Sequence, residues 1–319
     1  MKAALFTVLA VLTAVVLPDA LAQKYPTKPI RLIAPFAPGG GTDILSRLIA
    51  GPVSEALGQT VVVDNRPGAG GAIGAELTAT AQPDGYTLIM VSSSYAAGSA
   101  YHKVPYDPVN GIQPILLVGT VGLVMTVHPS LPAKSAKEFI DHAKGRPGKL
   151  NYATVGTGSV THLAHEQLKL MTGIDIVHVP YKGGGPALTA VIGGESQVSM
   201  ISMVPTIPHV RAGRLRAIGV TTPKRMHQMP DVPAIAESVR GFEVIHWYGI
   251  WGPKGLPKPI VERWNKEAAK VLFTPEMKRQ MEGEGLTAGG GAPEELGKII
   301  RRDVEKWRRV VKEAKMHRE

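Results

Sequence analysis

The sequence predicts an α/β protein made of two doubly wound lobes with a ligand cleft between them. Short apolar runs of strand length alternate with amphipathic stretches of helical spacing, a pattern typical of parallel sheets with crossover helices. The alternation comes in two series, one ending near residue 91 and one beginning near residue 115. Glycine-rich turns follow several apolar runs, at the strand ends where open α/β sheets bind ligands. A chain of 319 residues is long enough for two such cores.

The first series predicts three strands and two helices. The first strand covers the apolar residues 30–34. A helix follows between residues 44 and 57, where apolar side chains recur at helical spacing until Gly58 ends it. The remaining elements are a strand at 60–63, a small helix ending at 79 and a strand at 86–91.

The second series begins with a long strand or a strand pair over residues 115–127. The capping box Ser135-Ala136-Lys137-Glu138 opens a helix that Gly145 ends. Strands are expected at 150–155, 176–179, 198–203 and 215–221, separated by helices that end at 171, begin near Pro186 and end at 211. The chain beyond residue 230 predicts one more strand at 242–251 and two helices, which return to the first lobe.

Three glycine-rich turns, at residues 37–43, 156–159 and 183–185, are candidate ligand sites. Each runs from a predicted strand into a predicted helix, where backbone N–H groups are unpaired and the helix dipole is positive. Such a turn holds an anion without a cationic side chain. A single turn could equally be a tight connection without a ligand. Three turns spread over two lobes indicate a cleft that grips one anion from both sides, with Thr42 as a cap or donor and Asp43 as a cap.

Composition and motif spacing argue against most other classes. The absence of cysteine excludes disulfides, cysteine-ligated metals, thiol catalysis and a lipoprotein anchor. The glycine spacing matches neither a dinucleotide fingerprint nor a Walker loop, and Ser159 lacks the flanking glycines of a nucleophile elbow. His162 and His165 could ligate a metal, but structural histidines are the preferred interpretation. Aromatic residues make up 5% of the chain and do not interleave with basic ones, which argues against nucleic-acid binding.

Residues 1–22 have the features of a secretory signal. Lys2 precedes an apolar stretch of about 15 residues, shorter than a membrane span, and Ala20-Leu21-Ala22 resembles a cleavage site. We expect cleavage before Gln23 and export of a soluble protein to a bacterial periplasm, with an uncleaved anchor as the alternative.

The formal net charge of +10 has two sources. Residues 121–220 carry ten basic and five acidic groups, and residues 298–319 carry nine and four. The glycine turns hold only Asp43 and the adjacent Lys182. The surplus either attracts anions at low salt or is a solvated surface, which is the preferred interpretation.

Several blocks occur in a characteristic order along the chain: residues 26–33 (PTKPIRLI), 35–43 (PFAPGGGTD), 63–71 (VDNRPGAGG), 83–88 (PDGYTL), 156–159 (GTGS), 162–164 (HLA), 179–183 (VPYKG), 209–213 (HVRAG) and 247–249 (WYG). With these blocks the sequence closely resembles the periplasmic solute-binding proteins of tripartite tricarboxylate transporters, a family often called Bug. The resemblance spans essentially all of residues 25–315.

The resemblance implies a fold like that of type II periplasmic binding proteins, whose two lobes close on a solute like a flytrap. Lobe 1 would comprise residues 23–120 and 221–319, and lobe 2 residues 121–220, with hinges near 119–122 and 219–222. A carboxylate would be held mainly by backbone N–H groups, hydroxyls and ordered water. The implied contacts of lobe 1 are Phe36, Ala37, Gly41, Thr42, Asp43, Ser92 and Ser93. Those of lobe 2 are Thr157, Gly158, Ser159, His162 and Tyr181.

The implied function is capture of a small carboxylate, without catalysis, cofactor or metal. The closed monomer would then dock on integral-membrane transporter subunits; a receptor for a membrane sensor kinase is the alternative. Family members commonly carry acids where this chain has Ser199 and Ser202, and an acid near the ligand would suit an ammonium group. The hypothesis is therefore a carboxylate without an amino group, or a small aromatic acid.

Overall fold

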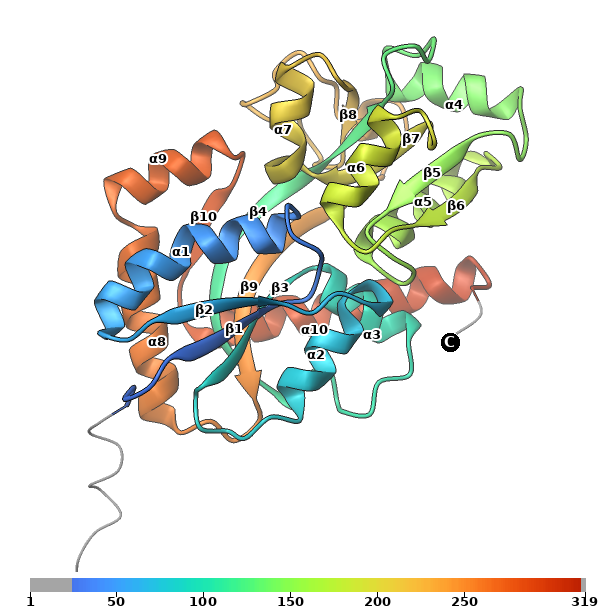
Figure 1. Cartoon of the computed structure of the whole chain (residues 1–319). Helices are drawn as coiled ribbons and strands as arrows, with labels where there is room; N and C mark the ends of the chain where they lie inside the picture. The colour runs from blue at the N-terminus through green and yellow to red at the C-terminus, as the bar shows by residue number, and fades with distance from the viewer. Residues whose placement is uncertain (1–24, 317–319) are drawn as a thin grey trace, which may run out of the picture.

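The structure is a computed structural model that describes residues 25–316. The expected signal sequence and its cleavage site lie outside this range. The described chain has the expected mixed α/β, two-lobed architecture, in which the strands form one curved sheet that continues from one lobe into the other (Figure 1). Within residues 25–316, the helices are too short or too polar for any of them to traverse a bilayer.

The first lobe contains strands in the order β2-β1-β3-β9-β4. The strands are β1 (Ile30–Ala34), β2 (Val61–Asn65), β3 (Thr87–Ser92), β9 (Ile245–Pro253) and the first part of β4 (Ile112–Val127). Strand β1 is parallel to β2 and β3, as the sequence predicts. Strand β9 is antiparallel to both of its neighbours, so the sheet is mixed rather than wholly parallel.

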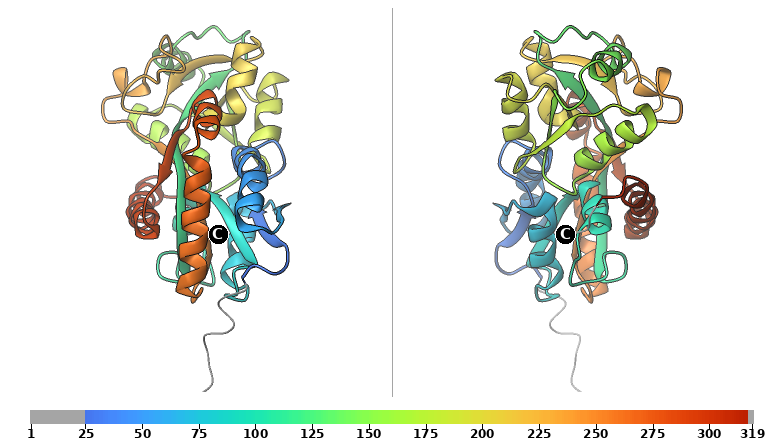
Figure 2. Two further views of the ribbon diagram at one scale, coloured as in Figure 1. Left: turned by 90° about the vertical axis from the view of Figure 1, so that its left-hand side faces the viewer. Right: turned by 90° about the vertical axis from the view of Figure 1, so that its right-hand side faces the viewer.

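Helices cover both faces of this sheet because alternate side chains of each strand point to opposite sides. Leu88 and Met90 of β3 pack in one core with helices α1 (Gly41–Leu57) and α8 (Lys258–Leu272). Ile89 and Val91 pack in the other core with α2 (Ala72–Ala79), α3 (Ser94–Tyr101) and α10 (Pro293–Glu313). Figure 2 shows α10 on the side of the molecule opposite to α1.

The second lobe is built on β5 (Asn151–Thr154), β6 (Val177–Pro180), β7 (Val198–Ser202) and β8 (Arg216–Val220). Its helices are α4 (Ala136–Lys144), α5 (Val160–Thr172), α6 (Gly184–Ile192) and α7 (Met203–Arg211). Strand β5 is parallel to β6 and β7, as expected for crossover connections. Ser135 caps α4 as predicted by accepting a hydrogen bond from the Glu138 backbone N–H. The Glu138 side chain accepts from the Lys134 N–H rather than from that of Ser135, so the capping box is present only in its Ser135 half.

Strand β4 joins the two lobes. It is one strand of 16 residues rather than a pair. Its residues 112–122 pair with β9, and its residues 123–127 pair with β7. The last residues of β4 also pair with β8. The same strand is therefore part of the sheet in both lobes.

Two helices and one strand of the structure differ from the sequence-based prediction, which does not contain them. Three helices follow β9 instead of two, since α9 (Pro275–Gly283) begins with Pro275 in its first turn immediately after α8. The short strand β10 (Thr287–Gly290) pairs with β4, and its glycines hide its strand character. Helix α3 was not predicted because all of its residues are buried, which leaves no amphipathic period.

The buried face of α10 fixes the position of β9. The Trp247 indole N–H donates to Asp303 Oδ2 at 2.7 Å, and both residues are buried. Because side chains alternate along a strand, the neighbours His246 and Tyr248 point to the opposite face. That face meets the second lobe.

Candidate ligand-binding site

A cavity lies where the two lobes meet. Its first-lobe lining consists of Phe36, Gly40, Gly41, Thr42, Ser92, Ser94, His246 and Tyr248. Its second-lobe lining consists of Val155, Thr161, Gly184, Ile201, Ser202 and Pro205. The cavity offers about 30 Å³ to the centres of water molecules, so the lobes are closed tightly around it.

The cavity is lined by hydroxyl groups and backbone groups together with apolar side chains, and none of the described residues that line it is an acid, a lysine or an arginine. Five helices begin at its wall. The lining includes the first residues of α1 (Gly41), α3 (Ser94) and α6 (Gly184), the second residue of α5 (Thr161) and the N-cap of α7 (Ser202). Each helix start presents unpaired N–H groups and a partial positive charge. The convergence creates a site for an anion without a cationic side chain.

Thr42 is the clearest donor in this wall. Its Oγ1 is buried and has no hydrogen-bond partner among the described residues. In the same turn the Ile44 N–H donates to the Gly40 carbonyl, whereas the N–H groups of Gly41, Thr42 and Asp43 find no acceptor in residues 25–316. A buried hydroxyl is rarely left unpartnered in a native protein. An oxygen atom of a ligand would satisfy it.

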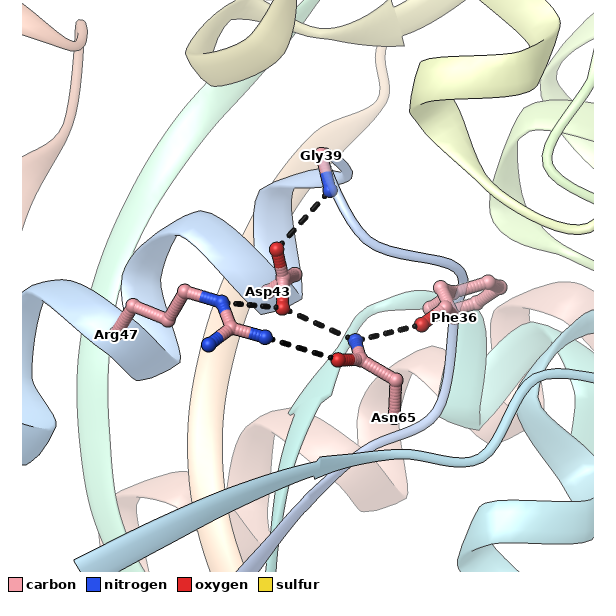
Figure 3. Close-up of polar contacts among 5 residues, drawn as sticks. All are labelled: Phe36, Gly39, Asp43, Arg47 and Asn65. Atoms are coloured by element: carbon pink, nitrogen blue, oxygen red, sulfur yellow. Dashed lines mark hydrogen bonds and ion pairs between the residues drawn. The ribbon is translucent and has the colours of Figure 1, made fainter.

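Asp43 holds the first turn in shape and does not line the cavity (Figure 3). Its Oδ2 accepts from the Gly39 N–H at 3.0 Å, and its Oδ1 accepts from Asn65 Nδ2 at 3.0 Å and from Arg47 Nε at 2.9 Å. Asn65 Nδ2 also donates to the Phe36 carbonyl at 3.0 Å. The network thus holds the turn in place through the Phe36 carbonyl and the Gly39 N–H.

The second-lobe turn is fixed in a similar way by His162, which lies behind it. The Gly158 N–H donates to His162 Nδ1 at 3.2 Å, and the His162 N–H donates to Ser159 Oγ at 3.3 Å. The Thr157 carbonyl accepts from His102 Nε2 of the first lobe at 3.2 Å. Thr157, Gly158 and Ser159 do not line the cavity, whereas Thr161, which follows this turn on α5, does.

His162 belongs to a stack of buried rings. Its ring lies 3.9 Å from that of His178, and the Tyr152 ring lies 4.4 Å from that of His165. Burial lowers the pKa of His162 and of His178 to about 3 and that of His165 to about 4. The rings are therefore neutral near pH 7, as the acceptor role of His162 Nδ1 requires. Across residues 25–316 no group of three side chains is arranged to hold a metal ion.

Backbone and side chains of the two lobes touch directly around the cavity. The Ala37 N–H donates to the Lys182 carbonyl at 2.9 Å, and Tyr248 Oη donates to Ser202 Oγ at 2.8 Å. The Val160 N–H donates to Ser94 Oγ at 3.3 Å. The structure therefore represents a closed arrangement of the lobes.

The cavity brings together part of the predicted set. Phe36, Gly41, Thr42 and Ser92 line it, whereas these others lie outside its lining: Ala37, Asp43, Ser93, Thr157, Gly158, Ser159, His162 and Tyr181. Tyr181 is directed toward Glu195, with 3.4 Å between Oη and Oε2.

Polar lining residues of two kinds lie outside the predicted set. Ser94, Thr161 and Ser202 stand at helix starts, so the strand–turn–helix rule could have found them. His246 and Tyr248 lie inside β9, where residue type alone does not reveal which face meets the cleft.

Comparison with known proteins places these features in a family. The model described as "Tripartite tricarboxylate transporter family receptor" matches residues 45–316. Protein BugT of Bordetella pertussis is 36% identical over 296 residues, which cover 92% of this chain and 91% of that protein.

Two solved structures are similar throughout. An R. palustris protein solved with adipate has a TM-score of 0.88 and 34% identity, covering 91% of this chain and 98% of its own. MatC from Rhodopseudomonas palustris, solved with bound malate, has a TM-score of 0.86 and 30% identity, and the match covers 90% of this chain and 100% of the MatC chain.

The buried histidines make stability depend on pH. Unfolded histidine titrates near pH 6.5, but His162, His165 and His178 accept protons in the folded state only near pH 3–4. The unfolded state therefore binds more protons between these values, and the free energy of unfolding should fall as pH falls from 6.5 toward 4. The slope reaches about 1.4 kcal/mol per pH unit for each histidine. Urea unfolding at several pH values measures it.

His165→Phe should flatten this slope, whereas replacement of the exposed His227 by Gln should leave it unchanged. An unaltered slope in His165→Phe would show that His165 does not contribute to the pH dependence.

Proposed function

The chain belongs to the tripartite tricarboxylate transporter receptor family, and on that premise we propose that it captures a small carboxylate between its lobes and delivers it to an integral-membrane transporter. Members of this family are solute-binding receptors, so the protein is a receptor and not an enzyme. In this proposal residues 1–22 direct export and are removed before Gln23, and the mature receptor works as a monomer in the periplasm.

The observation that carries the proposal is the convergence of helix starts on an uncharged, hydroxyl-lined cavity. A carboxylate has two oxygens that accept several hydrogen bonds at once. Backbone N–H groups and the free hydroxyl of Thr42 supply such donors. The negative charge of the ligand is balanced by helix dipoles.

The lining also supports a ligand without an amino group. Adipate and malate, the acids in the two related structures, have none. Ser202 lines the cavity, and Ser199 is buried against Thr126 with 2.9 Å between the two hydroxyl oxygens. No carboxylate in the lining, as far as the described residues go, is available to an ammonium group. We therefore extend the proposal to carboxylic acids that lack one.

Closure is the second part of the proposal. We take lobe 1 as residues 23–120 and 221–319, and lobe 2 as 121–220, with hinges near 119–122 and 219–222. The pairing of β4 changes from β9 to β7 between residues 122 and 123, and the Thr221 N–H donates to the Leu123 carbonyl at the second crossing. Contacts such as Tyr248 to Ser202 exist only when the lobes meet, so the ligand would favour the closed state by adding to them.

Calorimetry and small-angle scattering test the proposal. We expect adipate or malate to bind and to reduce the radius of gyration, and aspartate not to bind. Uptake of the same acid by cells that contain the membrane subunits should require this protein. Binding of aspartate but of neither acid would contradict the ligand class, and tight binding without compaction would contradict closure.

Thr42→Val should weaken binding of the acid by about tenfold, because it removes one hydrogen-bond donor to a charged group, a loss of about 1.5 kcal/mol. Calorimetric titration of the variant and of the native protein with the acid measures the loss of affinity. Ser46→Ala is the matched control: Ser46 Oγ on α1 is also buried without a partner in the described range 25–316, but Ser46 does not line the cavity. Equal losses in both variants would mean that Thr42 does not contact the ligand.

Gly70→Ala should hinder closure. A Cβ at Gly70 would overlap the Thr157 carbonyl oxygen of the other lobe, and overpacking of this kind costs about 1–3 kcal/mol. We expect affinity for the acid to fall by at least about fivefold and scattering to show an open form at ligand concentrations that close the native protein. Gly58→Ala is the matched control, since Gly58 also has a positive φ (+73°) but a Cβ there would meet nothing within 4 Å. Full compaction of Gly70→Ala at native affinity would refute the argument.

A further inference from the structure

His246 forms part of the cavity wall, although nothing in its sequence context marks it as a ligand residue. It lies on β9 with 4% of its surface exposed. Its Nδ1 lies 2.6 Å from Ser93 Oγ, and Ser93 itself is fully buried outside the lining. Since Nδ1 is engaged with Ser93, Nε2 is the ring nitrogen that remains available to the cavity.

The hydrogen bond to Ser93 determines which ring nitrogen carries the proton. If Nδ1 carried it, Nδ1–H would donate to Ser93 Oγ, and the Ser93 hydroxyl would need another acceptor. Among residues 25–316 the Ser93 hydroxyl has no partner besides His246. A buried hydroxyl without an acceptor costs about 1–3 kcal/mol. The favourable arrangement is donation from Ser93 Oγ–H to Nδ1, which leaves the proton of a neutral imidazole on Nε2.

We propose that His246 donates its Nε2–H to the bound carboxylate as an uncharged hydrogen-bond donor, and that Ser93 is the positioning residue that fixes this tautomer. The inference rests on the proposed function, since it names a contact to the same ligand. It also adds a reason for selectivity. An Nε2–H donor at this place interacts favourably with a carboxylate oxygen, which accepts hydrogen bonds. It interacts unfavourably with an ammonium group, because both groups donate and neither can accept.

The surroundings of His246 agree with an uncharged ring. Complete burial lowers its pKa to about 3, so the ring is neutral near pH 7. The Tyr248 ring packs edge-on at 4.7 Å, and burial raises the pKa of the Tyr248 hydroxyl, which keeps it protonated. That hydroxyl donates to Ser202 Oγ, so the Ser202 proton is free to point into the cavity. Ser202 and His246 are then neutral donors to the cavity, and Tyr248 orients the Ser202 hydroxyl.

The tautomer can be measured without any ligand. In protein labelled with ¹⁵N-histidine, the His246 signals, assigned by their loss in His246→Gln, should show a protonated Nε2 and an unprotonated Nδ1 at pH 7. In Ser93→Ala, which removes the donor to Nδ1, the signals should shift toward a mixture of tautomers. A protonated Nδ1 in the native protein would overturn the proposal.

Binding measurements test the contact itself, with adipate and malate as probes. His246→Gln keeps a neutral N–H donor and should retain affinity within about threefold, whereas His246→Leu keeps the bulk but no donor and should lose at least about tenfold. Melting temperatures confirm that both variants fold. Equal losses in the two variants would overturn the proposal. If neither acid bound the native protein, the proposed function would fail, and the ¹⁵N spectra would still decide the tautomer.

Discussion

The first turn of every α-helix leaves backbone N–H groups that the helix itself cannot satisfy, and the fold directs five such turns at one small cavity. No lining side chain among the described residues supplies a charge. The whole electrostatic attraction for an anion therefore depends on how accurately the helix starts are placed. The rest of the architecture serves this requirement. Strand β1 of the first lobe and β5 of the second lead into α1 and α5, which begin at the cavity from its two sides. The Asp43 and His162 contacts hold the two turns in position.

Backbone-based recognition explains the glycines at the meeting point of the lobes. A backbone N–H reaches a ligand, or the opposite lobe, only when no side chain keeps the chains apart. Gly70 and Gly156 lie so close that a Cβ on Gly156 would be 3.1 Å from Gly70 Cα, and a Cβ on Gly40 would be 3.4 Å from the Gly184 nitrogen. Close approach and anion binding thus require the same residue type at neighbouring positions.

This dual role also determines what could be predicted from sequence. The turns at residues 37–43 and 183–185 were identifiable because a strand, a glycine run and a helix follow one another directly. The capping role of Asp43 could be predicted from its place in the turn, but its hydrogen bond with Asn65 could not. Asn65 is far from Asp43 in sequence, and only the folded chain brings the two side chains together. His246 lies on a strand that is buried on both faces. Alternation of side chains shows that neighbouring residues of such a strand point to opposite faces, but it does not show which face meets the cleft. The short strand β10 was hidden because its glycines lack the β-branched side chains typical of strands.

The continuous strand β4 has a consequence for the integrity of the molecule. The two parts of β4 are paired in different lobes. Removal of either lobe would therefore leave part of β4 as an unpaired strand edge in the lobe that remains. The first lobe also draws on segments from both ends of the described chain, such as α1 and α10. The lobes are consequently not interchangeable modules. They share one continuous strand, so independent excision or exchange of a lobe between relatives would break the sheet itself.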